Sequence, residues 1–314
     1  MRSLLLTWRM QRWELAFLIG GSLLLAGAAA LLAWQIPTAY ENVIACAGRV
    51  PGEAMFASCR SEYDWAGYLA GASTIIQGAS TVVPFAVGIL LGAPLVAREI
   101  EKRTAPMAWS LSSSRGWWLA GRTLPLILAI AVALLLLGQA NEAMILANPD
   151  ATLGFQQFAM HGPLIAARGL ALFGIGVVVG LLMGRVLPAI LVTGLLSFAL
   201  VAGLQIGRDQ LRRAEATWVE AGEDGLLDFI YDQAFIDDAT GELVTYEEAS
   251  VRFPEVFGPE GSFMPPGMTQ VYLGTPPERY PIFVAREMGA LVLVTLVLGA
   301  TALWIVRWRR PDLG

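Results

Sequence analysis

Residues 92–118 read GAPLVAREIEKRTAPMAWSLSSSRGWW, and this stretch decides how the chain can fold. It holds six charged side chains between two long uncharged runs: Arg98, Glu99, Glu101, Lys102, Arg103 and Arg115. So many charges are too costly to place in hydrocarbon. We therefore expect the segment at one face of a membrane, in water, where another protein can touch it. We call residues 98–121 the elbow.

The composition is that of a membrane protein. Of the 314 residues, 56% are hydrophobic and only 15% are charged, which leaves too little charge to coat a soluble surface. A helical span needs about 20 mostly apolar residues. Uncharged stretches of that order predict about six helices, at residues 15–40, 65–97, 123–141, 169–184, 186–207 and 288–306. The fourth stretch is short, so its helix is expected to begin near Pro163 and to carry Arg168.

The N-terminus has a layout similar to that of a signal peptide, with Arg2, Arg9 and Arg12 ahead of an apolar run. That run is longer than the stretch of about 7–15 apolar residues typical of signal peptides, which favours an uncleaved first helix. The residues before it fit either a short interfacial helix or a simple basic flank, and both interpretations stay open.

Charge predicts the orientation in the membrane. Six helices place both termini on the same side as the elbow. The N-terminal arm has three Arg before its first acid, and the C-terminal tail has Arg307, Arg309 and Arg310 against Asp312. An excess of Lys and Arg marks the cytoplasmic side. We expect a multi-pass protein of the cell membrane with both termini in the cytoplasm.

The opposite side is expected to carry an acidic domain. Residues 205–282 contain fifteen Asp and Glu against five Arg. Residues 234–246 resemble two short strands about an Asp/Thr/Gly turn, residues 246–252 fit one or two helical turns, and Pro265, Pro266, Pro276, Pro277 and Pro281 predict an irregular return.

The predicted fold class is an all-α polytopic membrane protein with a small mixed exterior domain between helices five and six. Residues 1–204 would form helices one to five, with an exterior loop at 41–64 and the cytoplasmic elbow at 98–121. Residues 205–282 would form the acidic exterior domain, and residues 283–314 helix six with a basic cytoplasmic tail.

The only two cysteines, Cys46 and Cys59, both fall in the first exterior loop. An oxidising exterior favours their pairing in a disulfide. Such a disulfide would have a structural role, stapling the loop over the mouth of the pore.

Several chemical motifs are missing from the sequence. It has no Gly-x-x-x-x-Gly-Lys-Ser/Thr phosphate-binding loop and no Gly-x-Ser-x-Gly elbow. The single histidine, His161, has no Cys or carboxylate cluster beside it in the sequence, which makes a metal site a poor interpretation. Glu247 to Arg252 matches a metalloprotease signature by chance, because no further histidine follows it. Basic residues flank membrane helices, so nucleic-acid binding is not expected.

The elbow resembles the cytoplasmic loop of ATP-binding-cassette exporter permeases of the second class, most closely an actinobacterial type. In that group helix two ends in Gly-x-Pro-Leu, followed by Arg-Glu-x-Glu-x-x-Thr and then Trp-x-x-Ser-x-Ser-Arg and Trp. The matching positions are Gly92, Pro94, Leu95, Arg98, Glu99, Glu101, Thr104, Trp109, Ser112, Ser114, Arg115 and Trp118. The end of the chain is also similar, with Glu287 early in the last helix and Trp304 and Trp308 at its close.

The resemblance implies a permease that dimerises, with an identical copy or a paralogue, and binds two separate ATPase subunits, which carry the ATP and Mg. The elbow would be the coupling helix, with eight residues carried over as coupling residues: Arg98, Glu99, Glu101, Thr104, Trp109, Ser112, Arg115 and Trp118. Ser112–Ser114 suit a helix cap near Arg115. Taken singly, each of these residues also fits an ordinary interfacial anchor or a solvated charge.

Glu99 and Glu101 receive the sharpest expectation. They lie two residues apart, about 200° around a helix, so they do not share a face. One would meet the ATPase while the other braces the elbow against Arg98, Lys102 or Arg103. Replacing both by alanine is expected to leave the permease folded and to weaken docking or coupling.

Three charges are expected at membrane depth: Arg168, Arg286 and Glu287. Such charges are candidates for a functional role. Arg168 and Glu287 would pair across helices four and six, or each would reach the exterior surface by snorkelling.

The sequence is therefore interpreted as the permease subunit of an ATP-driven exporter. It would move an amphiphilic or hydrophobic substrate, such as a drug, lipid or peptide, and would not be an enzyme by itself. A membrane enzyme has no credible catalytic cluster in the sequence. The alternative is a sensor or scaffold whose exterior domain binds a ligand.

Overall fold

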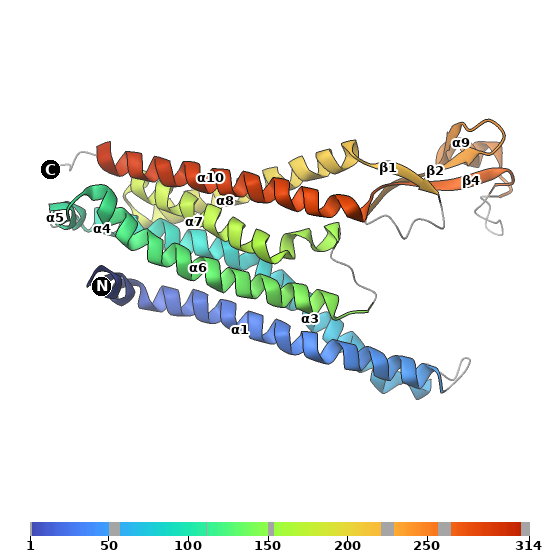
Figure 1. The fold of residues 1–314 in the computed structure, drawn as a ribbon, viewed down its shortest axis with the longest axis horizontal. Coiled ribbons are helices and arrows are strands. Elements are labelled where there is room, and N and C mark those ends of the chain that lie inside the picture. Colours follow the sequence, from blue (N-terminus) through green and yellow to red (C-terminus); the bar gives the residue numbers. More distant parts are fainter. Residues whose placement is uncertain are drawn as a thin grey trace. The chain divides into compact units, whose positions relative to one another are not determined.

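The computed structural model describes residues 2–49, 57–110, 112–149, 154–220, 229–256 and 265–308. Six helical segments among these residues are long and apolar enough to cross a membrane, as predicted (Figure 1). Helix α3 continues through a π-helical turn, Val87–Gly92, into α4. The helices that form these segments are α1 Arg2–Ala47, α3 Arg60–Ala86, α4 Ala93–Glu101, α6 Arg115–Leu146, α7 Gly162–Met183, α8 Val186–Ala214 and α10 Tyr280–Trp308.

The helices extend beyond the uncharged stretches. Helix α1 runs past Glu41 to Ala47, and α6 begins at Arg115, ahead of the uncharged stretch that starts at Thr123. Backbone hydrogen bonds continue the helix past a charged residue, so hydropathy locates the membrane section and not the helix end. The start of α7 at Gly162, with Arg168 inside the helix, agrees with the prediction.

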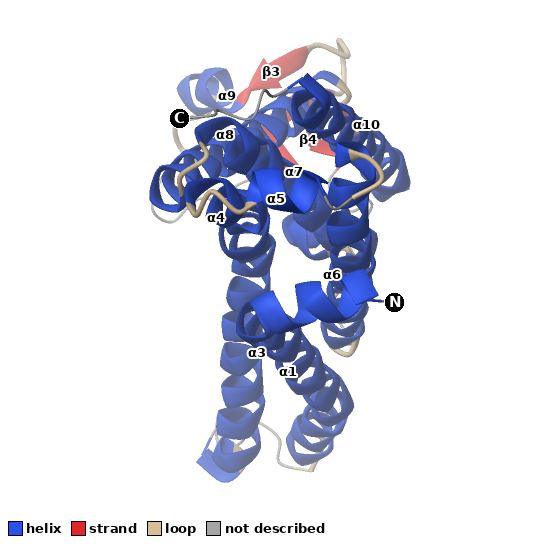
Figure 2. Cartoon of the chain, turned by 90° about the vertical axis from the view of Figure 1, so that its left-hand side faces the viewer, coloured by secondary structure: helices blue, strands red, loops and turns tan. Residues whose placement is uncertain are grey.

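The first turns of α1 bend away from the rest of the helix and lie across the end of the bundle that carries the elbow (Figure 2). The part of α1 that is apolar enough to span a membrane begins only at Ala16. This course fits the interfacial interpretation of the N-terminal arm better than a straight basic flank.

The chain divides into two compact units. One unit consists of residues 1–153, 157–201 and 286–314, and the other of residues 154–156 and 202–285. The first unit thus holds most of the membrane part, and the second holds the segment for which an exterior domain was predicted.

Helix α7 is the central helix of the first unit, and small residues let other backbones approach it closely. A Cβ atom at Gly92 would lie 2.6 Å from the carbonyl oxygen of Phe173, and one at Gly88 would lie 2.7 Å from that of Leu172. Gly176 faces Gly88 just as tightly. Glycines four residues apart are a common means of close helix packing in membranes. The π-helical turn therefore lies directly on α7.

Buried polar groups connect α6 to α3 in the same unit. The Asn141 amide donates to Ser80 Oγ at 3.0 Å and to the carbonyl of Leu137 at 2.9 Å. Both side chains are fully buried. In an apolar surrounding such groups must be paired, so the contact helps to fix how the two helices are aligned.

The two cysteines form a disulfide, as predicted. It joins Cys46 near the end of α1 to Cys59 just before α3, with Cα atoms 5.9 Å apart. The predicted loop of residues 41–64 is thus largely helical outside residues 50–56, which lie outside the described part of the chain. Its placement over a pore mouth stays a prediction.

The second unit contains a four-stranded antiparallel sheet in the order β1-β4-β2-β3. Its elements are β1 Thr217–Glu220, β2 Phe229–Asp237, β3 Leu243–Thr245, α9 Tyr246–Arg252 and β4 Met268–Thr275. The hairpin and the short helix were both predicted. Its small core contains Phe235, Val244, Ala249 and Met268.

The prediction of an irregular return after α9 was wrong for residues 268–275. They form β4, which pairs with both β1 and β2 and so joins the sheet together. The prolines flank this strand at Pro266 and Pro276 and do not interrupt it. Prolines at strand ends cost no ladder hydrogen bond, which is why the proline count misled.

Candidate functional site

The elbow makes its first sharp turn after α4. The N–H of Thr104 donates to the carbonyl of Glu99, and the N–H of Arg103 donates to that of Ile100, each at 3.0 Å. These two bonds form a Schellman motif, which needs a left-handed residue at its centre. Arg103 takes that conformation, with φ of 56°. The short helix α5, Ala105–Ser110, then leads back toward α6.

The second turn ends at the start of α6. Ser114 has extended backbone dihedrals, and its Oγ accepts a hydrogen bond from the N–H of Trp117 at 3.1 Å. This is an N-cap contact and confirms the predicted helix start near Arg115. Ser112 Oγ donates to the carbonyl of Trp109 at 3.1 Å, which closes the turn after α5.

Two tryptophans form the core of the elbow. The rings of Trp109 and Trp118 meet edge to face with centroids 6.0 Å apart, and both side chains are buried. The Arg115 guanidinium lies 5.0 Å from the Trp109 ring, and that of Arg122 lies 4.9 Å from the Trp118 ring. Cation–π contacts of this kind hold the arginines in place. The tryptophans thus shape the elbow from inside.

Glu99 is buried, with 4% of its surface exposed, and its carboxylate forms an ion pair with Arg122 of α6. A buried carboxylate needs such a partner because it has lost its water. The elbow is therefore joined to α6 by a charge pair that a docking protein cannot reach easily.

Glu101 is exposed and makes a different contact. Its Oε2 accepts a hydrogen bond from the N–H of Val186, the first residue of α8, at 2.9 Å. An anion at a helix N-terminus is favourable because the first N–H groups there have no partner within the helix. Glu101 thus joins the elbow to the turn between α7 and α8.

The two carboxylates therefore have bracing partners that were not expected from the sequence, Arg122 and the Val186 N–H. Arg122 was detectable as a charge seven residues into α6, whereas nothing in the sequence indicated the Val186 contact. Among the elbow side chains whose exposure the structure describes, the large exposed apolar ones are Met107 and Trp117, each 69% exposed. Met107 was not among the residues that the sequence pattern indicated.

Two of the three charged residues expected at membrane depth, Arg168 and Glu287, form an ion pair. Arg168 Nε donates to Glu287 Oε1 at 3.0 Å, and Arg168 Nη1 donates to the carbonyl of Ala159 at 3.3 Å. Both side chains of the pair are largely buried. Arg286 precedes Glu287 in α10 and is exposed. The contact joins α7 to α10 through two charges.

His161 lies immediately before α7 and contacts the carboxylate of Glu142. The same carboxylate accepts from the N–H of Gly162 at 3.0 Å. Among the residues that the structure describes, no group of three or more His, Cys, Asp or Glu side chains is placed to hold a metal ion.

Comparison with known proteins matches the chain to a family. A family model described as ABC-2 membrane transporter related matches residues 19–208, which include three of the six candidate spans, most of two others and the whole elbow. No curated protein and no solved structure matches the chain.

Proposed function

The chain belongs to the ABC-2 membrane transporter related family, and on this premise we propose that it is the permease subunit of an ATP-driven exporter. As a member of that family it is the membrane component of an ABC-2 type transporter, a kind of protein that typically has no catalytic activity of its own. The family also implies an ATPase partner. To this we add the docking place of the ATPase and the outward direction of transport.

The observation that carries the proposal is the construction of the elbow. It is a short, compact segment joined to α6 through Glu99 and Arg122 and to α8 through Glu101. A displacement of α5 that moved the end of α4 would therefore be passed to α6 and α8 through these two carboxylates. That is what coupling requires, since closure of an ATPase pair must move the helices that line the transport path.

We assign the docking contact to the exposed side of α5, chiefly to Met107. Large exposed apolar side chains next to charges are typical of the centre of an interface. The eight expected coupling residues then divide into three groups. Trp109, Trp118, Glu99 and Ser112 shape the elbow, while Glu101 and Arg115 anchor its ends. Arg98 lies in the last turn of α4, and Thr104 lies in the turn that follows it.

In this assignment two ATPase subunits bind ATP and Mg, two permease copies form the transport path, and the elbow and both termini lie in the cytoplasm. The acidic unit then lies outside the cell. The cargo would be amphiphilic or hydrophobic, because the spans offer few polar groups.

The test is purification of the full chain, in lipid, with and without the ABC-type ATPase encoded beside it. We expect stable copurification and ATP hydrolysis only with both subunits. A Met107→Asp variant should lose the ATPase, whereas Val251→Asp, at an exposed position of α9 outside the membrane spans, should not. ATP turnover by the single chain, or no copurifying ATPase, would contradict the proposal and favour the sensor or scaffold alternative.

A further inference from the structure

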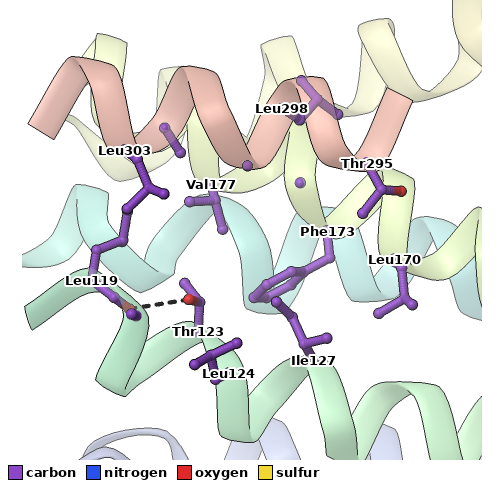
Figure 3. Close-up of a pocket in the computed structure, with 14 residues that line it drawn as sticks. Leu119, Thr123, Leu124, Ile127, Leu170, Phe173, Val177, Thr295, Leu298 and Leu303 are labelled. Carbon is purple, nitrogen blue, oxygen red and sulfur yellow. Dashed lines mark hydrogen bonds between the residues drawn. The ribbon is translucent and has the colours of Figure 1, made fainter. Parts of the chain in front are cut away.

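An apolar groove lies between α6, α7 and α10 in the membrane part of the first unit (Figure 3). Its cavity volume is about 210 Å³. The residues that line it include Leu119, Leu124, Phe173, Leu298 and Leu303, which Figure 3 labels. Two hydroxyls also line it. Thr123 donates to the carbonyl of Leu119 at 3.1 Å, and Thr295 donates to that of Leu291 at 2.8 Å. Since both hydroxyls already donate within their own helices, the groove suits an apolar occupant.

The groove continues into a basic mouth at the elbow end. The mouth is lined by Ser114, Arg115, Gly116, Trp117, Leu303 and Arg307, and has a volume of about 430 Å³. Leu303 lines both spaces. On α6, Leu119 and Ala120 of the groove follow Gly116 and Trp117 of the mouth by one turn, so the two share a helix face.

The mouth is a favourable place for an anion. Its lining holds two guanidiniums and no carboxylate. A Cβ atom at Gly116 would lie 4.0 Å from Arg307 Nε, so the end of α10 places its charge over the first turn of α6. The N–H groups of that turn add a favourable field for negative charge. Trp117 is 69% exposed, as is common for aromatic residues at headgroup level.

We propose that the groove and the mouth together bind one anionic phospholipid, with an acyl chain in the groove and the phosphate between Arg115 and Arg307. The apolar groove and the basic mouth follow one another just as the acyl chain and the phosphate do in a phospholipid. One turn of a helix about 10 Å across and 5.4 Å long fills roughly 420 Å³, twice the cavity volume of about 210 Å³, which disfavours insertion of a helix from a second copy. A bilayer lipid is present wherever the protein is. This inference does not depend on the export role.

The experiment measures lipid retained by the full chain. Protein is reconstituted into nanodiscs of equal parts phosphatidylglycerol and phosphatidylcholine, extracted, and weighed by native mass spectrometry. Wild type should retain phosphatidylglycerol in preference to phosphatidylcholine. Arg115→Gln with Arg307→Gln should lower that preference about 25-fold, since each arginine contributes about fivefold near a lipid surface. Lys102→Gln, an exposed elbow cation outside the mouth, is the matched control and should behave as wild type.

A second pair of variants tests the groove. Gly299 lines it, and an added Cβ there meets no atom within 4 Å. Gly299→Phe should therefore fill the groove and reduce retention of the lipid at least as strongly as loss of the arginines. Gly289→Phe is the control, because Gly289 lies on the same helix, is equally open and lines no part of the groove.

Three results would overturn the proposal. The first is equal retention of both lipids by wild type, which needs no variant and so stands even where a variant fails to fold. The second is unchanged retention in the arginine double variant. The third is a Gly299→Phe protein that keeps its lipid but loses its dimer, which would assign the groove to a second copy.

Discussion

Glu99 of the elbow and Glu248 of the sheet unit are both glutamates near the start or end of a short helix, and they are held in opposite ways. Glu99 is buried and paired with Arg122, 23 residues away. Glu248 lies on the surface and forms a capping box with Thr245, three residues away. The comparison shows that the elbow depends on contacts between distant helices, whereas α9 depends on its own neighbours. Four changes test this difference.

The largest effect is expected from Glu99→Gln. It leaves the Arg122 charge buried beside Trp118 without its carboxylate, and breaking a buried pair costs about 3–5 kcal/mol. The alanine double variant of Glu99 and Glu101 should therefore not keep wild-type stability, contrary to the expectation from sequence. Thermal unfolding of the full chain in nanodiscs measures this. Adding Arg122→Gln should recover part of the loss, and an unchanged melting temperature would show that the pair is not structural.

The disulfide gives the next effect. Cys46 and Cys59 are 13 residues apart, and closing a loop of that length stabilises by about 3 kcal/mol in the chain-entropy account. The double Ser variant should be less stable by that free energy and should melt at a lower temperature. The melting temperature of wild type in reductant should approach that of the variant. If reductant lowered the melting temperature of the variant as well, the shift would have another cause.

Glu101→Ala should cost less stability than Glu99→Gln, on the order of 0.5–2 kcal/mol for a lost helix cap. Its effect on coupling should be greater than its effect on folding, because it frees α8 from the elbow. ATP hydrolysis should continue in the assembled complex while transport falls. Glu41→Ala, at an exposed position of α1 far from the elbow in sequence, serves as the control. Equal loss of hydrolysis and transport would argue against a bracing role.

The smallest effect is expected at Glu248. Hydrogen bonds from Thr245 lower the pKa of this carboxyl below its ordinary value. Since the folded pKa is below the unfolded one, the contribution is present above the unfolded pKa and lost as pH falls through the folded pKa.

Hydrogen exchange of the α9 amides checks this, with wild type and Glu248→Gln compared at equal pH so that intrinsic rates cancel. Wild type should be the better protected at pH 7, and the difference should vanish in acid. A difference that persisted in acid would exclude the carboxylate as its source.

The same contrast explains what the sequence could predict. The spans, the Asp/Thr/Gly hairpin, the cap at Ser114 and the Cys46–Cys59 pair each depend on local residue pattern, and each was predicted. The contact from Glu101 to Val186 crosses 85 residues and exists only once α4 and α8 are packed. Strand β4 was missed because its prolines were counted without regard to their position at its ends. The burial of Trp109 and Trp118 likewise depended on the fold.

The π-helical turn at Val87–Gly92 has a mechanical consequence. A π-turn is equivalent to one residue inserted into a helix, so it offsets the angular register of the segments on either side by about 100°. Elbow residues in α4 therefore face a direction that an unbroken α3 would not give them. Glu99 points at Arg122 in this register, and a return to plain α-helical geometry would rotate it away. The six-residue π-turn therefore fixes the rotation of α4 about its axis relative to α3. The close contact of Gly88 and Gly92 with α7 stabilises this π-helical geometry.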